Sequence, residues 1–140
     1  MEIKDKAIRY FREGYNCSQA VLLACAGESQ TGARVSAAFG GGMGRMQKTC
    51  GAVTGAYIYF GMTYGAPGVP GEGDKTRVYD RVKSFNKMFV ERNGTDLCYE
   101  LLGEDLNTPE GKAKIRENDL HAKVCEKCIS DSIDIIGQIR

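Results

Sequence analysis

Six cysteines are the residues of this 140-residue chain that are best able to carry chemistry. A chain of this length can bury about 70% of its unfolded surface, so it needs neither a disulfide nor a metal merely to fold. Metal binding or thiol redox chemistry is therefore the leading explanation for the cysteines. The chain has one histidine, His121, so any metal site must be mostly thiolate, which favours iron–sulfur or zinc.

Cys125 and Cys128 form the only closely spaced pair, Cys-x-x-Cys. With His121 and Cys98 they could form a zinc site, but zinc sites built from local spacing usually combine two such motifs, and here there is one. The sequence contains no Cys-x-x-Cys-His, so no covalently bound c-type haem is expected. Cys25 lies in an apolar run and is expected to act as a small buried hydrophobe.

Cys50 follows a glycine-rich segment. Four glycines between positions 40 and 44 predict a mobile loop, and the run that follows has the length of a helix. Thr49 is a suitable N-cap for that helix, so Cys50 is expected in its first turn, where free N–H groups and the helix dipole favour a thiolate. Arg45 and Lys48 add positive charge nearby. The sequence therefore predicts a lowered pKa and a reactive thiol at Cys50.

Small residues follow Cys50 along the predicted helix, at positions 51, 52, 55 and 56. Glycine in a helix interior costs about 1 kcal/mol relative to alanine, so the two glycines need a packing or functional reason. Either another backbone or a cofactor could approach this surface closely. The glycines of the preceding loop could likewise donate backbone N–H groups to sulfur. The candidate cofactor-binding glycines are Gly42, Gly44, Gly51 and Gly55.

Helices are expected to position the cysteines, because apolar residues recur at helical spacing through most of the chain. Cys17 follows Asn16, a suitable N-cap, in a helix that Gly27 ends, so Cys17 also lies in a first turn. Two helix N-termini that converge on one anionic centre both stabilise it. Cys98 also falls near a helix start, within the segment 95–103.

The remaining helices are predicted from periodicity, caps and glycine stops. They cover residues 2–12, 32–39, 74–93 and 108–118, with a final amphipathic helix after Cys128. The turn-rich segment 64–73 divides the chain, but each half is too small for a comfortable core. We therefore predict an all-α fold, one compact domain over residues 1–140 with six or seven short helices and a glycine-rich loop before the Cys50 helix.

Charge and hydropathy exclude several classes of partner. Nineteen basic and 18 acidic side chains are interleaved and the net charge is +1, so no patch typical of nucleic-acid or membrane binding stands out. No apolar run approaches the roughly 18 residues of a membrane span, and the charged N-terminus lacks a signal-peptide core. We expect a cytoplasmic protein without nucleic-acid or membrane partners. The aromatic face of residues 57–64 could cover the core or a second copy, which leaves a homo-oligomer open.

The string Cys50-Gly-Ala-Val-Thr-Gly55, read with Cys17, Cys98 and Cys125, resembles the hallmark of the C_GCAxxG_C_C family of redox-active proteins. The resemblance covers most of the chain and implies redox or metal chemistry by cysteine, with Cys17, Cys50, Cys98 and Cys125 as the metal ligands. Cys128 departs from the four-cysteine pattern, as a spare ligand or a disulfide partner of Cys125. A more distant resemblance to a domain of split-Soret cytochromes implies an iron–sulfur cluster.

Three functions from different classes follow. In the first, the four cysteines ligate an iron–sulfur cluster, or another metal, for electron transfer. In the second, a thiol–disulfide enzyme, Cys50 attacks a substrate and Cys125, Cys128 or Cys17 resolves the mixed disulfide. In the third, the cysteines form a structural metal-binding module without turnover. Four cysteines in four segments favour a cluster over a dithiol, and the redox partner, a protein or a small thiol, stays open.

Overall fold

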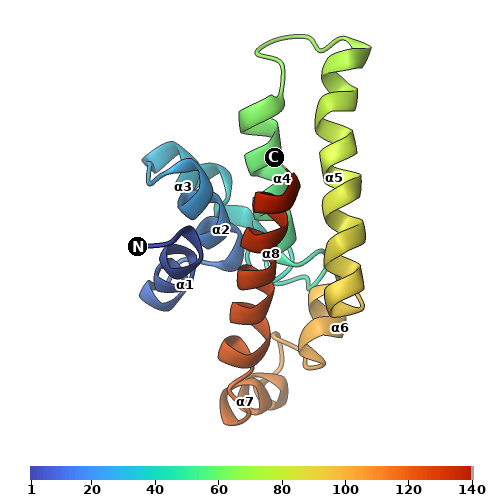
Figure 1. Ribbon diagram of the computed structural model, residues 1–140. Coiled ribbons are helices and arrows are strands. Elements are labelled where there is room, and N and C mark those ends of the chain that lie inside the picture. The colour runs from blue at the N-terminus through green and yellow to red at the C-terminus, as the bar shows by residue number, and fades with distance from the viewer. Residues whose placement is uncertain (140) are drawn as a thin grey trace.

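Helices form the regular secondary structure of the protein in the computed structural model, which describes residues 1–139 (Figure 1). The all-α prediction is confirmed, with eight α-helices in these residues where six or seven were expected. A 3₁₀ turn, Ala37–Phe39, follows α3, and a π-helical turn, His121–Cys125, precedes α8. The α-helices are α1 (Ile3–Glu13), α2 (Cys17–Ala26), α3 (Gln30–Val35), α4 (Gly51–Tyr64), α5 (Glu72–Asn93), α6 (Cys98–Leu102), α7 (Pro109–Glu117) and α8 (Glu126–Ile139).

The hydrophobic core lies where α2, α4, α5 and α8 pack against one another, while α1 covers α2 and α8. In Figure 1, α5 stands beside α4 and α8, and α1 to α3 lie on the opposite side of α8. The predicted buried face of α5 is confirmed, since Phe85 and Phe89 are fully buried and Val78, Val82 and Met88 pack half-buried against the core. Among the described residues, no helix is both long and apolar enough to cross a bilayer.

The aromatic face of α4 belongs mainly to the core. Tyr59 and Phe60 are buried, and the ring centroids of Tyr57 and Phe60 lie 5.8 and 6.0 Å from that of Phe85 on α5. Met62, on the same helix, is 54% exposed. The sequence allowed this aromatic face to cover either the core or a second copy of the chain. The rings of Tyr57, Tyr59 and Phe60 pack inside the chain.

The small residues of α4 allow α2 to approach closely. A Cβ added to Gly51 would lie 2.9 Å from Cys17 Cβ and 3.0 Å from Ser18 N, and one added to Gly55 would lie 2.6 Å from Ser18 O. The surface that the sequence left to either a backbone or a cofactor is therefore occupied by the backbone of α2. This contact sets the start of α2 beside the start of α4.

The glycine-rich segment before α4 is a hydrogen-bonded left-handed turn. Five consecutive residues, 41–45, have φ between 59° and 69°, although Met43 and Arg45 are not glycines. The N–H groups of Arg45, Gln47 and Lys48 donate to carbonyl oxygens of residues 40–42 at 2.9 to 3.1 Å. Left-handed backbone costs about 1–2 kcal/mol for each L-residue, which explains why glycine supplies three of the five positions.

Candidate functional site

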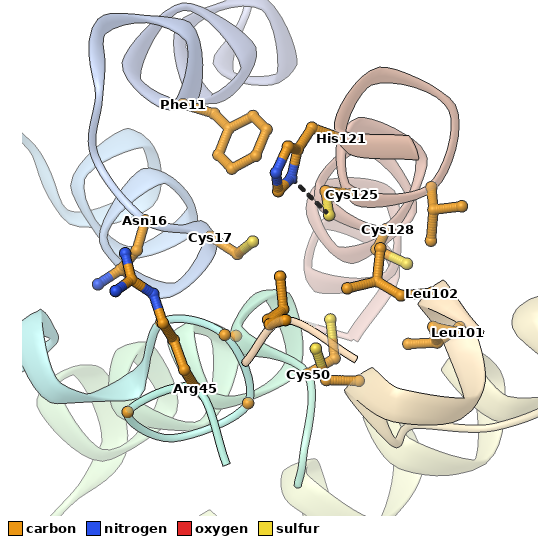
Figure 2. A pocket seen from close by; sticks show the side chains of 18 of the residues that line it. Phe11, Asn16, Cys17, Arg45, Cys50, Leu101, Leu102, His121, Cys125 and Cys128 are labelled. Atoms are coloured by element: carbon orange, nitrogen blue, oxygen red, sulfur yellow. Dashed lines mark hydrogen bonds between the residues drawn. The ribbon is translucent and has the colours of Figure 1, made fainter. Parts of the chain in front are cut away.

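One cavity of about 560 Å³ gathers five of the six cysteines (Figure 2). They come from the starts of α2, α4 and α6, from the π-helical turn and from α8. Cys25 lies outside this cavity and packs half-buried against the core. Cys17, Cys50, Cys98 and Cys125, which were predicted to come together, therefore line one cavity. Cys128 lines the same cavity.

The start of α2 positions Cys17 as the sequence predicts. Asn16 Oδ1 accepts a hydrogen bond from Gln19 N at 2.9 Å, and Gln19 Oε1 accepts one from Asn16 N at 3.0 Å. These two bonds form a capping box, and Gly27 is the C-cap. Cys17 is consequently the first residue of α2 and lies on the cavity wall.

The start of α4 differs from the prediction. Thr49 is not the N-cap, because it forms an isolated bridge with Leu97, and Cys50 N donates to Asp96 O at 2.7 Å. Cys50 is itself the N-cap, and α4 begins at Gly51. The segment just before α6 thus fixes the backbone of residues 49–50, a long-range pairing that local spacing does not reveal.

The predicted lowering of the Cys50 pKa is wrong. The hydrogen-bond interaction with Cys128 and then burial hold the pKa of Cys50 well above its ordinary value, and a backbone hydrogen bond from Ala52 opposes them more weakly. Cys50 is only 7% exposed. Desolvation of a buried thiolate outweighs the helix dipole, so Cys50 is a neutral thiol.

Cys17 and Cys125 form the pair in which one sulfur is a thiolate. Their side-chain hydrogen-bond interaction raises the pKa of Cys17 well above its ordinary value. The same interaction lowers the pKa of Cys125 to about 6, against burial, with further lowering by His121. The Cys17 thiol is the donor in this pair and the Cys125 thiolate is the acceptor. The cavity cysteine whose pKa is lowered is therefore Cys125.

His121 faces Cys125 across one π-helical turn. Its Nδ1 lies 3.7 Å from Cys125 Sγ, and its ring packs 6.2 Å from the ring of Phe11 (Figure 2). The hydrogen bond with Cys125 raises the pKa of His121. Single π-helical turns occur frequently at functional sites. From the sequence, His121 was considered only as a possible zinc ligand, whereas its spacing of four residues from Cys125 was the available signal for a thiolate partner.

Cys128 and Cys98 lie deeper in the cavity. Cys128 is 1% exposed and interacts with Cys50, while Cys98 is 8% exposed. Burial, followed by the charges of Cys50 and Cys125, raises the pKa of Cys98 to about 12, although Gln47 opposes this with a hydrogen bond. Cys128 reaches the cavity because it follows Cys125 by three residues, on the same helical face.

Three of the four predicted cofactor-binding glycines line the cavity, namely Gly42, Gly44 and Gly51. A Cβ added to Gly42 would lie 2.7 Å from Cys98 Cβ, so glycine lets the left-handed turn press against that cysteine. Gly55 does not line the cavity, since the space beside it is filled by α2. Contact with a cofactor stays a prediction for the first three.

The wall of the cavity carries no carboxylate. Apart from the cysteines, its ionisable groups are Arg45 and His121, and its apolar part is formed by Phe11, Leu101, Leu102, Leu106 and Val124. The first residues of α2 and α4 also lie on this wall. The positive ends of two helix dipoles therefore face the sulfur atoms.

The cysteines do not form a binding site for one metal ion as they are arranged. Among residues 1–139, no three or more His, Cys, Asp or Glu side chains are grouped to hold such an ion. The arrangement thus gives no support to the predicted zinc site of Cys98, His121, Cys125 and Cys128. An iron–sulfur cluster takes four cysteines spread over more than one iron, and the five cavity thiols match that donor chemistry.

Comparison with curated proteins and with solved structures gives no significant match. One family model does match, with the description "Putative redox-active protein (C_GCAxxG_C_C)", over residues 15–139. The matched span includes the five cavity cysteines and the string Cys50–Gly55. The resemblance noted in the sequence is confirmed, and this chain belongs to the C_GCAxxG_C_C family of redox-active proteins.

Proposed function

We propose that this protein is a thiol–disulfide redox protein in which Cys125 is the attacking thiolate and Cys17 the resolving thiol. The observation that carries the proposal is the interaction of these two sulfurs on the wall of one cavity. His121 Nδ1, 3.7 Å from Cys125 Sγ, supports the thiolate form. This assignment keeps the second function suggested by the sequence but replaces Cys50 by Cys125 as nucleophile.

The reaction is balanced for a disulfide substrate RSSR. The Cys125 thiolate attacks one substrate sulfur, which breaks the substrate S–S bond, forms a mixed disulfide and releases one RS⁻. The Cys17 thiol then loses its proton to a released thiolate and attacks Cys125 Sγ. A Cys17–Cys125 disulfide forms, the second RS⁻ leaves, and the protein has given up two electrons. A small thiol or a partner dithiol returns these electrons and restores the reduced pair.

The positions of the two thiols favour this order of events. Cys125 is half-buried and carries the lowered pKa, whereas Cys50 is nearly inaccessible and carries a raised one. Because Cys17 and Cys125 line the same cavity and interact there, the resolving step is intramolecular, and such positioning accounts for much of the advantage of an intramolecular reaction.

The proposal is tested by mapping which thiol reacts first. The reduced protein is treated briefly with iodoacetamide at pH 5 to 9, and the modified cysteine is identified by peptide mass spectrometry. We expect Cys125 to react first, with an apparent pKa of about 6, and the Cys17→Ser variant to accumulate the mixed disulfide. A Cys25→Ser variant, altered outside the cavity, is the control. First reaction at Cys50, or titration of every thiol near pH 9, would contradict the assignment.

A second candidate is supported by a separate observation, the presence of five cysteines on one wall without carboxylates. In this case Cys17, Cys50 and Cys125, with either Cys98 or Cys128, would hold an iron–sulfur cluster. Such a cluster supplies one-electron transfer. The N-termini of α2 and α4 and the N–H groups of the left-handed turn would stabilise its negative charge.

Anaerobic purification separates the two candidates. Iron and acid-labile sulfide in equal amounts, with a brown colour and a loss of about four free thiols, would support the cluster. Iron-free, colourless protein with all six thiols reactive after unfolding would support the dithiol function. No disulfide joins any of the six cysteines in the structure, so the thiol count has a defined starting value.

A further inference from the structure

We propose that the cavity selects a small anionic disulfide, with Arg45 binding the negative group of the substrate while its sulfur reaches Cys125. The proposal rests on the thiol–disulfide function above and specifies the substrate class. The observations that carry it are the charge distribution and the accessible groups of the cavity wall. These observations are separate from the two cysteines of the proposed function.

The distribution of charge on the wall is one-sided. The chain has 18 acidic residues in 140, so an even distribution would place two or three of them among the 20 residues that line the cavity. The wall has none, and Arg45 carries its permanent positive charge. A negative substrate therefore meets attraction and no carboxylate repulsion at this wall.

Arg45 is held in place by its backbone. Its N–H donates to Gly40 O at 3.1 Å, and its carbonyl oxygen accepts from Asn107 Nδ2 at 2.8 Å. Its φ of 64° is unfavourable for an arginine, so the surrounding contacts, rather than its own preference, keep it there. The backbone from which the Arg45 side chain extends is thus held in place, although the residue is exposed.

The guanidinium group of Arg45 is available for a ligand. No ion pair involves it among the described residues. Arg45 lines the cavity, and Figure 2 shows its side chain extending from the left-handed turn on the same side of the cavity as Cys17. Arginine binds carboxylate groups in a two-pronged geometry, which makes a carboxylate-bearing substrate the best match.

The size and the floor of the cavity indicate a small molecule. Its volume of about 560 Å³ falls within the range of about 300–1,000 Å³ found for ligand pockets. The apolar side chains of Leu101, Leu102 and Val124 can cover the carbon atoms of a short disulfide. Half-buried thiols, an arginine whose backbone is held in place and apolar lining side chains together fit a low-molecular-weight disulfide that carries carboxylates.

The test compares three dialkyl disulfides of different charge with the full-length reduced protein. Dithiodiglycolate is anionic, bis(2-hydroxyethyl) disulfide is neutral and cystamine is cationic. The rate of Cys17–Cys125 disulfide formation is measured in single-turnover experiments by acid quenching and mass spectrometry, and each rate is divided by that of a model thiol. We expect the order anionic, neutral, cationic, with about fivefold between the first two, a difference that shrinks as salt is added.

Variants at Arg45 test the assignment of the cation. Arg45→Gln should lower the anionic rate about fivefold and leave the neutral rate unchanged. Arg45→Gly removes the same charge while suiting the positive φ, which guards against misfolding, and Arg45→Lys should retain most of the preference. Lys48→Gln is the matched control, since Lys48 is an exposed cation three residues away that does not line the cavity.

The outcomes distinguish this proposal from the function on which it rests. Equal normalised rates for the three disulfides, or equal losses in the Arg45→Gln and Lys48→Gln variants, would overturn the anion selectivity and leave the dithiol function standing. Failure of all three disulfides to oxidise the Cys17–Cys125 pair would overturn both.

Discussion

Two pairs of cysteines share one cavity but differ in what surrounds the sulfur. The outer pair, Cys17 and Cys125, is half-buried and lies beside His121, whereas the inner pair, Cys50 and Cys128, is buried and has no imidazole neighbour. The outer pair contains a thiol with a pKa of about 6, while the pKa of Cys50 in the inner pair is well above its ordinary value.

The comparison shows that burial and neighbouring groups, rather than the helix start, decide which cysteine ionises. Cys17 and Cys50 both lie at helix starts, and the pKa of each is raised. A helix N-terminus stabilises a negative charge by about 0.3–1 kcal/mol at exposed sites. Full burial can shift a pKa by about 3–5 units, which is a larger effect in the opposite direction.

The largest expected difference between the pairs is in thiol reactivity. At pH 7 a thiol of pKa 6 is about 90% thiolate and one of pKa 9 about 1%, so Cys125→Ser should reduce the initial alkylation rate about 50- to 100-fold. Cys128→Ser, the matched change in the inner pair, should leave most of that rate. The measurement is the initial rate of iodoacetamide consumption. Comparable losses in both variants would remove the distinction between the pairs.

The next effect concerns the left-handed turn that lies against the inner side of the cavity. Gly42→Ala places a Cβ 2.7 Å from Cys98 Cβ, Gln47 Cα and Lys48 N, at a φ of 69°, so we expect a loss of about 2–4 kcal/mol in unfolding free energy. Gly61→Ala, in α4 with open space at the Cβ, should be neutral or slightly stabilising. Urea denaturation measures both. An unchanged Gly42→Ala midpoint would show that the turn tolerates a side chain.

A smaller effect is expected from the imidazole beside the outer pair. His121 lowers the pKa of Cys125, so His121→Gln should raise it, by about one unit, which corresponds to about 1.4 kcal/mol. The measurement is thiolate absorbance at 240 nm between pH 4 and 10. The wild-type protein should show one ionisation near pH 6, displaced upward in the variant, while Cys98 stays protonated throughout because its pKa is about 12. An unshifted titration would exclude His121 as the supporting group.

The smallest effect compares the two helix starts. Asn16 caps α2 with its side chain, whereas Thr49 makes no side-chain cap at α4. Asn16→Ala should therefore cost about 1 kcal/mol in unfolding free energy, and Thr49→Ala a few tenths of that value. Thermal denaturation of the two variants gives the difference. A larger loss at Thr49 would restore the capping role predicted from the sequence.

The helices and most of their ends could be predicted from the sequence, because they depend on groups that lie within a few residues of one another. Asn16 and Gly27 bound α2 as predicted, Thr108 caps α7 ahead of Pro109, and Gly94 ends α5. The family string and the spaced cysteines likewise indicated redox chemistry by sulfur, and the family is confirmed. Local hydrogen bonds and apolar periodicity can be predicted from a sequence because each involves residues within one or two helical turns.

Which sulfur atoms interact, and which cysteine has the lowered pKa, depends on how distant segments of the chain pack together. Thr49 pairs with Leu97 instead of capping α4, and Cys128 lines the cavity with the other four cysteines. The interaction with Cys128, together with burial, raises the pKa of Cys50 and keeps it a neutral thiol. These outcomes depend on desolvation and on interactions between segments more than a hundred residues apart, such as that of Cys17 with Cys125. The free energies of desolvation and of these interactions depend on how α2, α4 and α8 pack around one cavity. They therefore could not be predicted from the order of residues along the chain.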